Sequence, residues 1–202
     1  MDDYFAVFGL PRTLQVNLEA LQRRFYELSR LHHPDFHRMA GEERQAAALA
    51  SSALINRAYR ALRDPLARVE YLIALEEGRE GKEGAAVKAT APPKAPTDLL
   101  EEMLEVQETL EEAKTSGLDD AARSHLSQER QRLIDRRAAT EAEIIARCPD
   151  WDAAVVAGGA RAPLLERFKE QLATRAYLGT VIDDLSVALG EDQDAHVPHR
   201  RH

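Results

Sequence analysis

The chain has 202 residues and a net charge of −8 at pH 7, a length that allows one or two domains. Half of the residues are Ala, Leu, Glu or Arg, which favour helices, and only 5% are aromatic, so the composition argues against a β-sandwich or β-barrel. No apolar run reaches the length of a membrane span, and the start Met1-Asp2-Asp3 lacks a signal-peptide pattern, so we expect no membrane partner. The single cysteine, Cys148, excludes an internal disulfide and fits the reducing cytoplasm, where we expect the protein.

The negative charge is concentrated in the second half of the chain. Residues 98–190 hold 11 basic and 19 acidic residues, a net charge of −8, whereas residues 1–77 have a net charge of −1. A nucleic-acid-binding protein normally carries a basic surface, and no segment of this sequence does, so we expect no nucleic-acid partner. The acidic half favours a basic partner. A well-solvated helical surface would explain the same charge.

Four regions follow from composition and periodicity. They are residues 1–77, 78–98, 99–190 and 191–202. The second is rich in Gly and then in Pro, which is typical of a linker, and the last has no apolar periodicity and is expected to be a disordered tail. The first and third carry helical patterns, so we predict an all-α protein with an N-terminal four-helix domain and a C-terminal three-helix bundle.

The predicted helices of the first region span about residues 4–10, 17–31, 41–63 and 65–76. Asn17 caps the second helix, and Asp64 followed by Pro65 begins the fourth. Pro34 prevents continuation of the second helix, because the residue before a proline avoids helical backbone angles. The apolar face of the second helix consists of Leu18, Leu21, Phe25 and Leu28. Its opposite, charged side carries Arg23, Tyr26 and Arg30, with Arg24 borderline by angle.

The predicted helices of the third region span about residues 98–114, 119–147 and 163–189, and Cys148-Pro149 ends the second of them. The core seam of the first helix is Leu99, Met103, Val106 and Leu110. Leu100 and Leu104 lie about 100° to one side of this seam, near three carboxylates. Those carboxylates belong to Glu105, Glu108 and Glu112. Such a surface suits a partner, although the two leucines could instead widen the core stripe.

The seam predicted for the last helix consists of Leu165, Phe168, Leu172, Gly179, Ile182, Leu185 and Leu189. Tyr177 lies off this seam. It is therefore a weaker candidate for a partner contact than the leucines of the first helix.

A set of short motifs in residues 1–77 indicates a family. His33-Pro34-Asp35 lies in the break between two helices, and the surrounding motifs keep a fixed order. Those motifs are Asp3-Tyr4-Phe5, Phe8-Gly9-Leu10, Ile55-Asn56-Arg57-Ala58-Tyr59, and Arg68 with Tyr71. This set resembles the J-domain of DnaJ-type co-chaperones. Because an acidic helical segment follows and no zinc-binding cysteines do, the whole layout resembles the HscB-type co-chaperones of iron–sulfur cluster assembly.

The resemblance implies two partners and no catalytic residue or cofactor. The J-domain would stimulate ATP hydrolysis by a DnaK-class chaperone that is HscA-like, and the C-terminal bundle would bind an IscU-type scaffold. The residues expected to bind the chaperone are His33, Pro34, Asp35, Arg23, Arg24, Tyr26 and Arg30. The residues expected to bind the scaffold are Leu100, Leu104, Glu105, Glu108, Glu112 and Tyr177.

Two alternatives stay open at this point. The protein could be a J-domain co-chaperone for a different client, with the C-terminal bundle as an unrelated adaptor. It could also be a small helical metal-binding protein that uses His32, His33 and His37. We expect no metal, because Pro34 breaks the helical spacing of these histidines and no thiol or carboxylate pattern completes a site.

Overall fold

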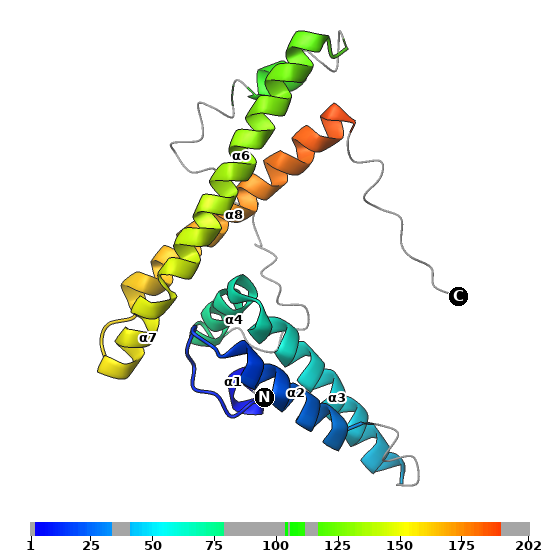
Figure 1. Cartoon of the computed structure of the whole chain (residues 1–202), viewed down its shortest axis with the longest axis vertical. Helices are drawn as coiled ribbons and strands as arrows, with labels where there is room; N and C mark the ends of the chain where they lie inside the picture. Colours follow the sequence, from blue (N-terminus) through cyan, green and yellow to red (C-terminus); the bar gives the residue numbers. More distant parts are fainter. Residues whose placement is uncertain (1–2, 34–40, 79–103, 105, 112–116, 191–202) are drawn as a thin grey trace. The chain divides into compact units, whose positions relative to one another are not determined.

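The structure, a computed structural model, describes residues 3–33, 41–78, 104, 106–111 and 117–190. Within these ranges the chain is α-helical and has no strand, so the predicted all-α class is confirmed (Figure 1). The helices are α1 (Tyr4–Val7), α2 (Leu18–Leu31), α3 (Glu42–Arg63), α4 (Pro65–Glu76), α6 (Asp120–Ala146), α7 (Cys148–Ala157) and α8 (Ala162–Leu189). Residue 104 and residues 106–111 are also helical. The tail at 191–202 and all of the predicted linker except Gly78 lie outside the described residues.

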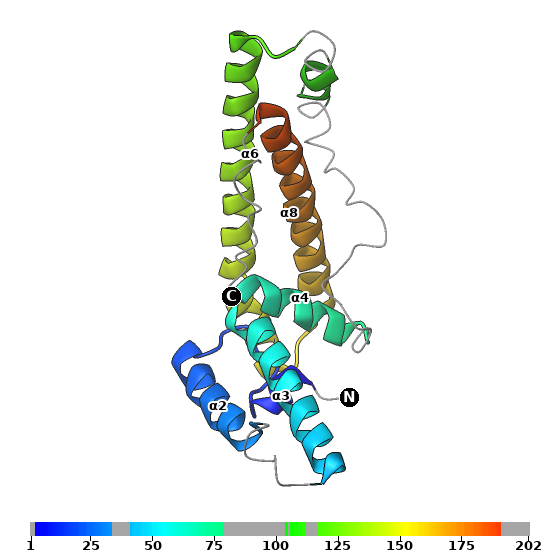
Figure 2. The ribbon, with the colours of Figure 1, turned by 90° about the vertical axis from the view of Figure 1, so that its right-hand side faces the viewer.

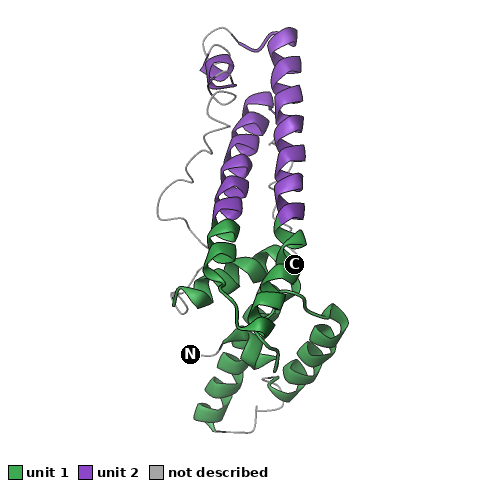
Figure 3. Cartoon of the chain, turned by 90° about the vertical axis from the view of Figure 1, so that its left-hand side faces the viewer, with its two compact units in different colours: residues 1–88, 144–169 green, residues 89–143, 170–202 purple. Residues whose placement is uncertain are grey.

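The chain forms two compact units (Figure 3). Unit 1 contains residues 1–88 and 144–169, and unit 2 contains residues 89–143 and 170–202. Unit 1 therefore combines the N-terminal segment with α7 and the adjoining ends of α6 and α8. The domain limits proposed from the sequence stay a prediction.

Side-chain caps fix where the N-terminal helices begin. The backbone N–H of Ala20 donates to Oδ1 of Asn17 at 2.9 Å, at the start of α2. The backbone N–H of Ala67 donates to Oδ1 of Asp64 at 2.8 Å, and Pro65 occupies the first position of α4. A proline is tolerated there because the first N–H groups of a helix have no intrahelical partner. Both caps are the ones predicted from the sequence.

The core of unit 1 forms around α3, which packs against α1, α2 and α4 (Figure 2). Phe25 of α2 stacks on Tyr59 of α3 with ring centroids 4.1 Å apart. Tyr4 of α1 stacks on Tyr71 of α4 at 4.3 Å, and the backbone N–H of Tyr4 donates to the Tyr71 hydroxyl. The buried side chains of these helices include Phe5, Leu21, Ala58, Leu62, Val69 and Leu72. Each fully buried leucine contributes roughly 2 kcal/mol to this packing.

Helix α7 is an element that the sequence did not reveal. The Cys148-Pro149 pair was interpreted only as the end of the preceding helix. In the structure Pro149 lies in the first turn of α7, where its missing N–H costs nothing, so the same residue that ends α6 begins α7. Gly158 then ends α7 with φ 62°, a left-handed conformation that glycine adopts without strain.

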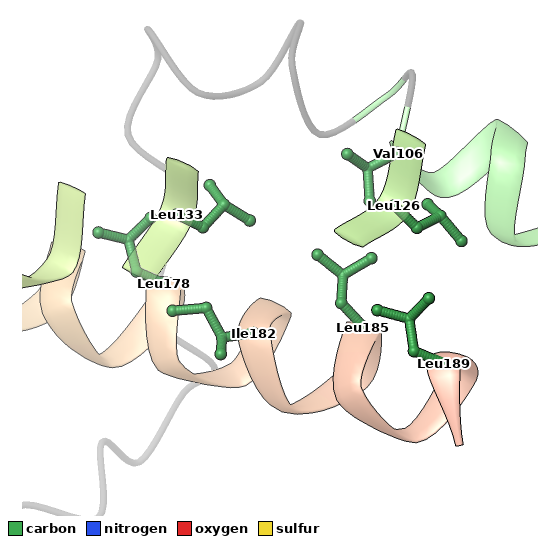
Figure 4. Close-up of a cluster of buried hydrophobic side chains, with 7 residues drawn as sticks. All are labelled: Val106, Leu126, Leu133, Leu178, Ile182, Leu185 and Leu189. Carbon is green, nitrogen blue, oxygen red and sulfur yellow. The ribbon is translucent and has the colours of Figure 1, made fainter. Parts of the chain in front are cut away.

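Unit 2 has its own apolar core, in which residues from the segment before α6 pack with α6 and α8 (Figure 4). The buried members are Val106, Leu126, Leu133, Leu178, Ile182, Leu185 and Leu189. Val106, which was predicted to face the core, is 2% exposed. Leu110 packs against the cluster from its edge, as the same seam requires.

The buried seam of α8 differs by one residue from the predicted one at two positions. Gln171 and Leu178 are buried, whereas Leu172 and Gly179 are only half-buried, as is Leu165 at the start of the predicted seam. From Phe168 onward, the buried positions follow in steps of three, seven, four, three and four residues. Gln171 is the polar member of that seam, and its side-chain amide donates to Glu143 at 2.9 Å. The apolar pattern missed Gln171 because this buried position is polar.

Candidate functional site

The exposed face of α2 carries the residues predicted to bind a chaperone. Arg23, Arg24, Tyr26 and Arg30 are all exposed, and 61% of Tyr26 is accessible to solvent. Positions 23, 26 and 30 form one stripe along the helix, because they are separated by three and four residues. The apolar face of α2 points elsewhere, since Leu21 is buried and Phe25 is stacked on α3.

The charges of this face remain largely solvated. Arg23 lies 4.0 Å from Glu19, and Arg24 forms a 2.9 Å ion pair with Glu27. All four side chains of these pairs are more than half exposed, so each pair contributes little to folding and leaves the arginines accessible to an acidic partner. Arg30 lies in the last turn of α2, where a positive charge complements the helix dipole.

His33 immediately follows the end of α2. His32 closes that helix, because its backbone N–H donates to the Leu28 carbonyl at 3.0 Å, and the side chain of His33 is exposed. The structure therefore places His33 next to the arginine end of the α2 face. Pro34 and Asp35, the other members of the tripeptide, lie outside the described residues.

The residues predicted to bind a scaffold are described in part. Leu104 is 59% exposed, whereas Val106 is buried, because positions two apart on a helix point about 200° away from each other. Glu108 is exposed on the same helical segment. Leu104 thus faces away from the core, as the partner-surface interpretation requires. Leu100, Glu105 and Glu112 lie outside the described residues.

Tyr177 of α8 is half-buried against the core cluster of unit 2. Burial raises the pKa of its hydroxyl. The side chain is thus partly a packing residue and presents less surface to a partner than Leu104 does.

Within unit 1, a buried polar network combines Arg68, which belongs to the family motifs, with Asp152, for which the sequence suggested no role. Arg68 of α4 is 4% exposed and donates from Nε to the Leu62 carbonyl at 2.7 Å and from a terminal nitrogen to the Leu14 carbonyl. Asp152 of α7 accepts from the backbone N–H groups of Leu14 at 2.6 Å and Gln15 at 2.8 Å. No side-chain motif could reveal these contacts, because the partners are backbone groups, and those of Leu14 and Gln15 are distant in the chain.

Burial also shifts the pKa values of the ionisable groups in this network. Desolvation lowers the pKa of the Arg68 guanidinium, opposed by the nearby Cys148, Asp64 and Asp152. Desolvation raises the pKa of the Cys148 thiol to about 11, and the charge of Asp152 acts in the same direction. The thiol donates to the Ile144 carbonyl at 3.5 Å. A buried, protonated thiol of this kind is a packing group.

The described part of the chain holds no group of three His, Cys, Asp or Glu side chains arranged to bind a metal ion. In the same ranges no helix combines the length and apolar character needed to span a membrane.

Comparison with known proteins identifies the architecture. No family model matches the sequence. The chaperone HscB from Vibrio cholerae superposes with a TM-score of 0.59 at 20% sequence identity, and the match covers 94% of this chain and 99% of that one. The chain has the HscB fold. The human co-chaperone protein HscB superposes with a TM-score of 0.55 at 24% identity, over 93% of this chain and 82% of that one. The fold implied by the sequence resemblance is therefore confirmed for nearly the whole chain. The exposed α2 face and Leu104 are surface features of this fold.

Proposed function

We propose that this protein is an HscB-type co-chaperone of iron–sulfur cluster biogenesis. Its N-terminal helices dock on a DnaK-class, HscA-like chaperone and stimulate ATP hydrolysis by that partner. Its C-terminal helices bind an IscU-type scaffold protein and deliver it to the chaperone. The protein itself carries out no catalytic step. The cytoplasmic location expected from the cysteine content belongs to the same proposal.

One observation carries the chaperone part of this proposal. An exposed stripe of Arg23, Tyr26 and Arg30 ends beside His33, the first residue of the His-Pro-Asp tripeptide, on an HscB fold. Cationic side chains on a solvated helix face attract an acidic partner surface and orient the encounter. The tripeptide that begins at His33 can then bring its own groups against the chaperone.

The tripeptide supplies the first test. ATP hydrolysis by a purified DnaK-class chaperone is measured with increasing amounts of the protein. We expect stimulation by the unmodified chain and none by the His33→Gln and Asp35→Asn variants. His37→Gln, the same substitution in the same inter-helix segment, is the control and should stimulate normally. We expect each substitution to alter the free energy of unfolding by no more than about 0.5 kcal/mol, so thermal melts should be unchanged. Full stimulation by Asp35→Asn would refute the J-domain function.

The arginine face supplies the second test. Arg23→Ala and Arg30→Ala should weaken stimulation, and their difference from the unmodified chain should shrink at high salt, because the attraction that these arginines supply is then screened. Arg44→Ala, which removes an exposed arginine from the first turns of α3, is the matched control and should have no effect.

The client is the less constrained part of the proposal. The alternative is a J-domain co-chaperone in which the C-terminal helices bind a different client. Stimulation of the chaperone without measurable binding of an IscU-type scaffold would favour that alternative. Binding of the scaffold by the full chain, lost when Leu104 is truncated, would favour iron–sulfur cluster biogenesis.

A further inference from the structure

The side chain of Asp152 connects helix α7 to the loop between α1 and α2. The carboxylate of Asp152 accepts two consecutive backbone N–H groups, those of Leu14 and Gln15, one on each oxygen. A loop residue has no helical partner for its N–H, so such a group needs a side chain or water instead. A carboxylate that accepts from backbone N–H groups forms charge-assisted hydrogen bonds, which are shorter and stronger than neutral ones.

The backbone N–H, the backbone carbonyl and the side chain of Leu14 are all held by the surrounding structure. Its N–H is bound by Asp152 of α7, its carbonyl is bound by Arg68 of α4, and its side chain is 2% exposed. Three independent restraints leave this residue little conformational freedom. Asn17, the cap that begins α2, follows only three residues later. The position of Leu14 therefore determines where the chain enters α2.

Other contacts attach the same region of the chain to α4. Arg161 forms an ion pair with Glu76 at 3.3 Å, and Lys169 forms one with Glu77 at 3.0 Å. The Arg161 guanidinium also lies 5.6 Å from the ring centroid of Trp151, which is fully buried beside Asp152 in α7. The two ion pairs hold the chain after α7 to the end of α4, and the Arg161–Trp151 contact connects α7 to them. Helix α7 is therefore packed as part of unit 1, and Asp152 is well placed to hold the loop.

We propose that Asp152 is a positioning residue for chaperone docking, because it holds Leu14 and Gln15 and so fixes the start of α2. This inference rests on the proposed function. Helix α2 has 14 residues, about 20 Å at 1.5 Å per residue, so a small error at its entry becomes a larger displacement of Arg30 and His33 at its far end. The stack of Phe25 on Tyr59 holds the middle of α2 independently. Loss of Asp152 should therefore loosen the helix without unfolding it.

The expected signature is a change in affinity. A protein whose docking face is correctly placed only part of the time binds more weakly, in proportion to that fraction, but acts normally once bound. In the Asp152→Ala variant, the concentration needed for half-maximal stimulation of the chaperone should rise roughly tenfold, equivalent to about 1.4 kcal/mol. The maximal stimulation at saturation should stay the same. Asp152→Asn keeps one carbonyl acceptor, so its half-maximal concentration should lie between those of the unmodified protein and Asp152→Ala.

Asp150→Ala is the matched control. It removes the same charge from the first turn of the same helix, and Asp150 is exposed. Its half-maximal concentration should equal that of the unmodified protein. A tenfold rise in this control as well would assign the effect to charge on α7 and overturn the proposal.

A second measurement does not depend on the chaperone. Hydrogen exchange of the Leu14 and Gln15 amides should be slow in the unmodified protein and in Asp150→Ala, and fast in Asp152→Ala. The emission of Trp151, the single tryptophan, should stay that of a buried ring in all variants, which shows that α7 is still packed.

The two measurements separate the possible failures. Protected amides released by Asp152→Ala, together with an unchanged half-maximal concentration, would overturn the positioning role and leave the proposed function intact. Rapid exchange of both amides in the unmodified protein would overturn the contact itself. A full chain that stimulates no DnaK-class chaperone would overturn the proposed function and this inference together, whatever the amides do.

Discussion

Leu104 and Val106 provide a direct test of which side of their helical segment meets a partner. They are two residues apart, and one is 59% exposed whereas the other is 2% exposed. We compare Leu104→Ala with Val106→Ala, since each removes only apolar atoms from the same short helix. The first should affect binding of an IscU-type scaffold, and the second should affect folding.

The magnitudes follow from burial. Truncating a fully buried leucine to alanine costs about 2–5 kcal/mol, so a side chain with about two fifths of its surface buried should cost no more than about 1–2 kcal/mol. Val106→Ala removes two buried methyl groups, at about 0.8 kcal/mol each before any cavity is counted, for roughly 2 kcal/mol in total. For a chain of this length 1 kcal/mol shifts the melting temperature by about 2–4 °C. Val106→Ala should therefore lower it by roughly 4–8 °C.

Scaffold binding should respond in the opposite order. An apolar anchor near the centre of an interface costs upward of about 1–2 kcal/mol when truncated, or roughly a five- to thirty-fold increase in Kd. Leu104→Ala should show this loss in a titration with the scaffold, and the Leu100→Ala, Leu104→Ala double variant a larger one. Val106→Ala, measured well below its melting temperature, should bind normally. Unchanged binding by the double variant, with melting unchanged, would refute a client site on this helix.

Three further expectations concern the buried network and the connection between the regions. Arg68→Ala should lower the free energy of unfolding by about 2–4 kcal/mol, because it leaves the buried Leu14 and Leu62 carbonyls without donors, and Arg68→Lys should recover part of that loss in denaturant titrations. The pKa of Cys148 is raised to about 11 in the folded state from 9.0, so its stabilising contribution is complete below pH 9 and should be lost by pH 11. That loss amounts to about 2–3 kcal/mol and should be absent from the melts of Cys148→Ala. Limited proteolysis within residues 80–96 should yield two fragments that still elute together, since residues 144–169 remain packed in unit 1; fragments that separate without denaturant would contradict this packing.

Much of the fold could be predicted because the helix boundaries are encoded locally. Asn17, Asp64 and Pro65 act within one turn of their own positions, so capping chemistry alone located the starts of α2 and α4. The exposure of Arg23 and Leu104 followed from angular arithmetic along a single helix. Their roles in binding remain predictions.

The parts that the sequence did not reveal depend on long-range or polar packing. Pro149 was interpreted as a stop, although a proline is equally compatible with the first turn of a new helix, and only the surrounding packing decides between the two. Gln171 is buried because Glu143 accepts its amide, and an apolar pattern cannot register such a pair. Asp152 recognises backbone groups, whose identity no side-chain motif records.

The hydrogen bond between Leu14 and Asp152 also determines when, during synthesis, the N-terminal helices can reach their final arrangement. It joins residues 138 positions apart, so the ribosome delivers α1 to α4 long before the carboxylate that completes their loop. Asp152 follows Glu76, the last residue of α4, by 76 residues, so at about 5–20 residues per second the interval is roughly 4–15 s. During that time the nascent N-terminal helices have the Leu14 and Gln15 amides still bound to water. The α2 face thus reaches its final setting only after most of the polypeptide has been synthesised, and on our proposal a nascent chain would be a poor stimulator of any chaperone it meets.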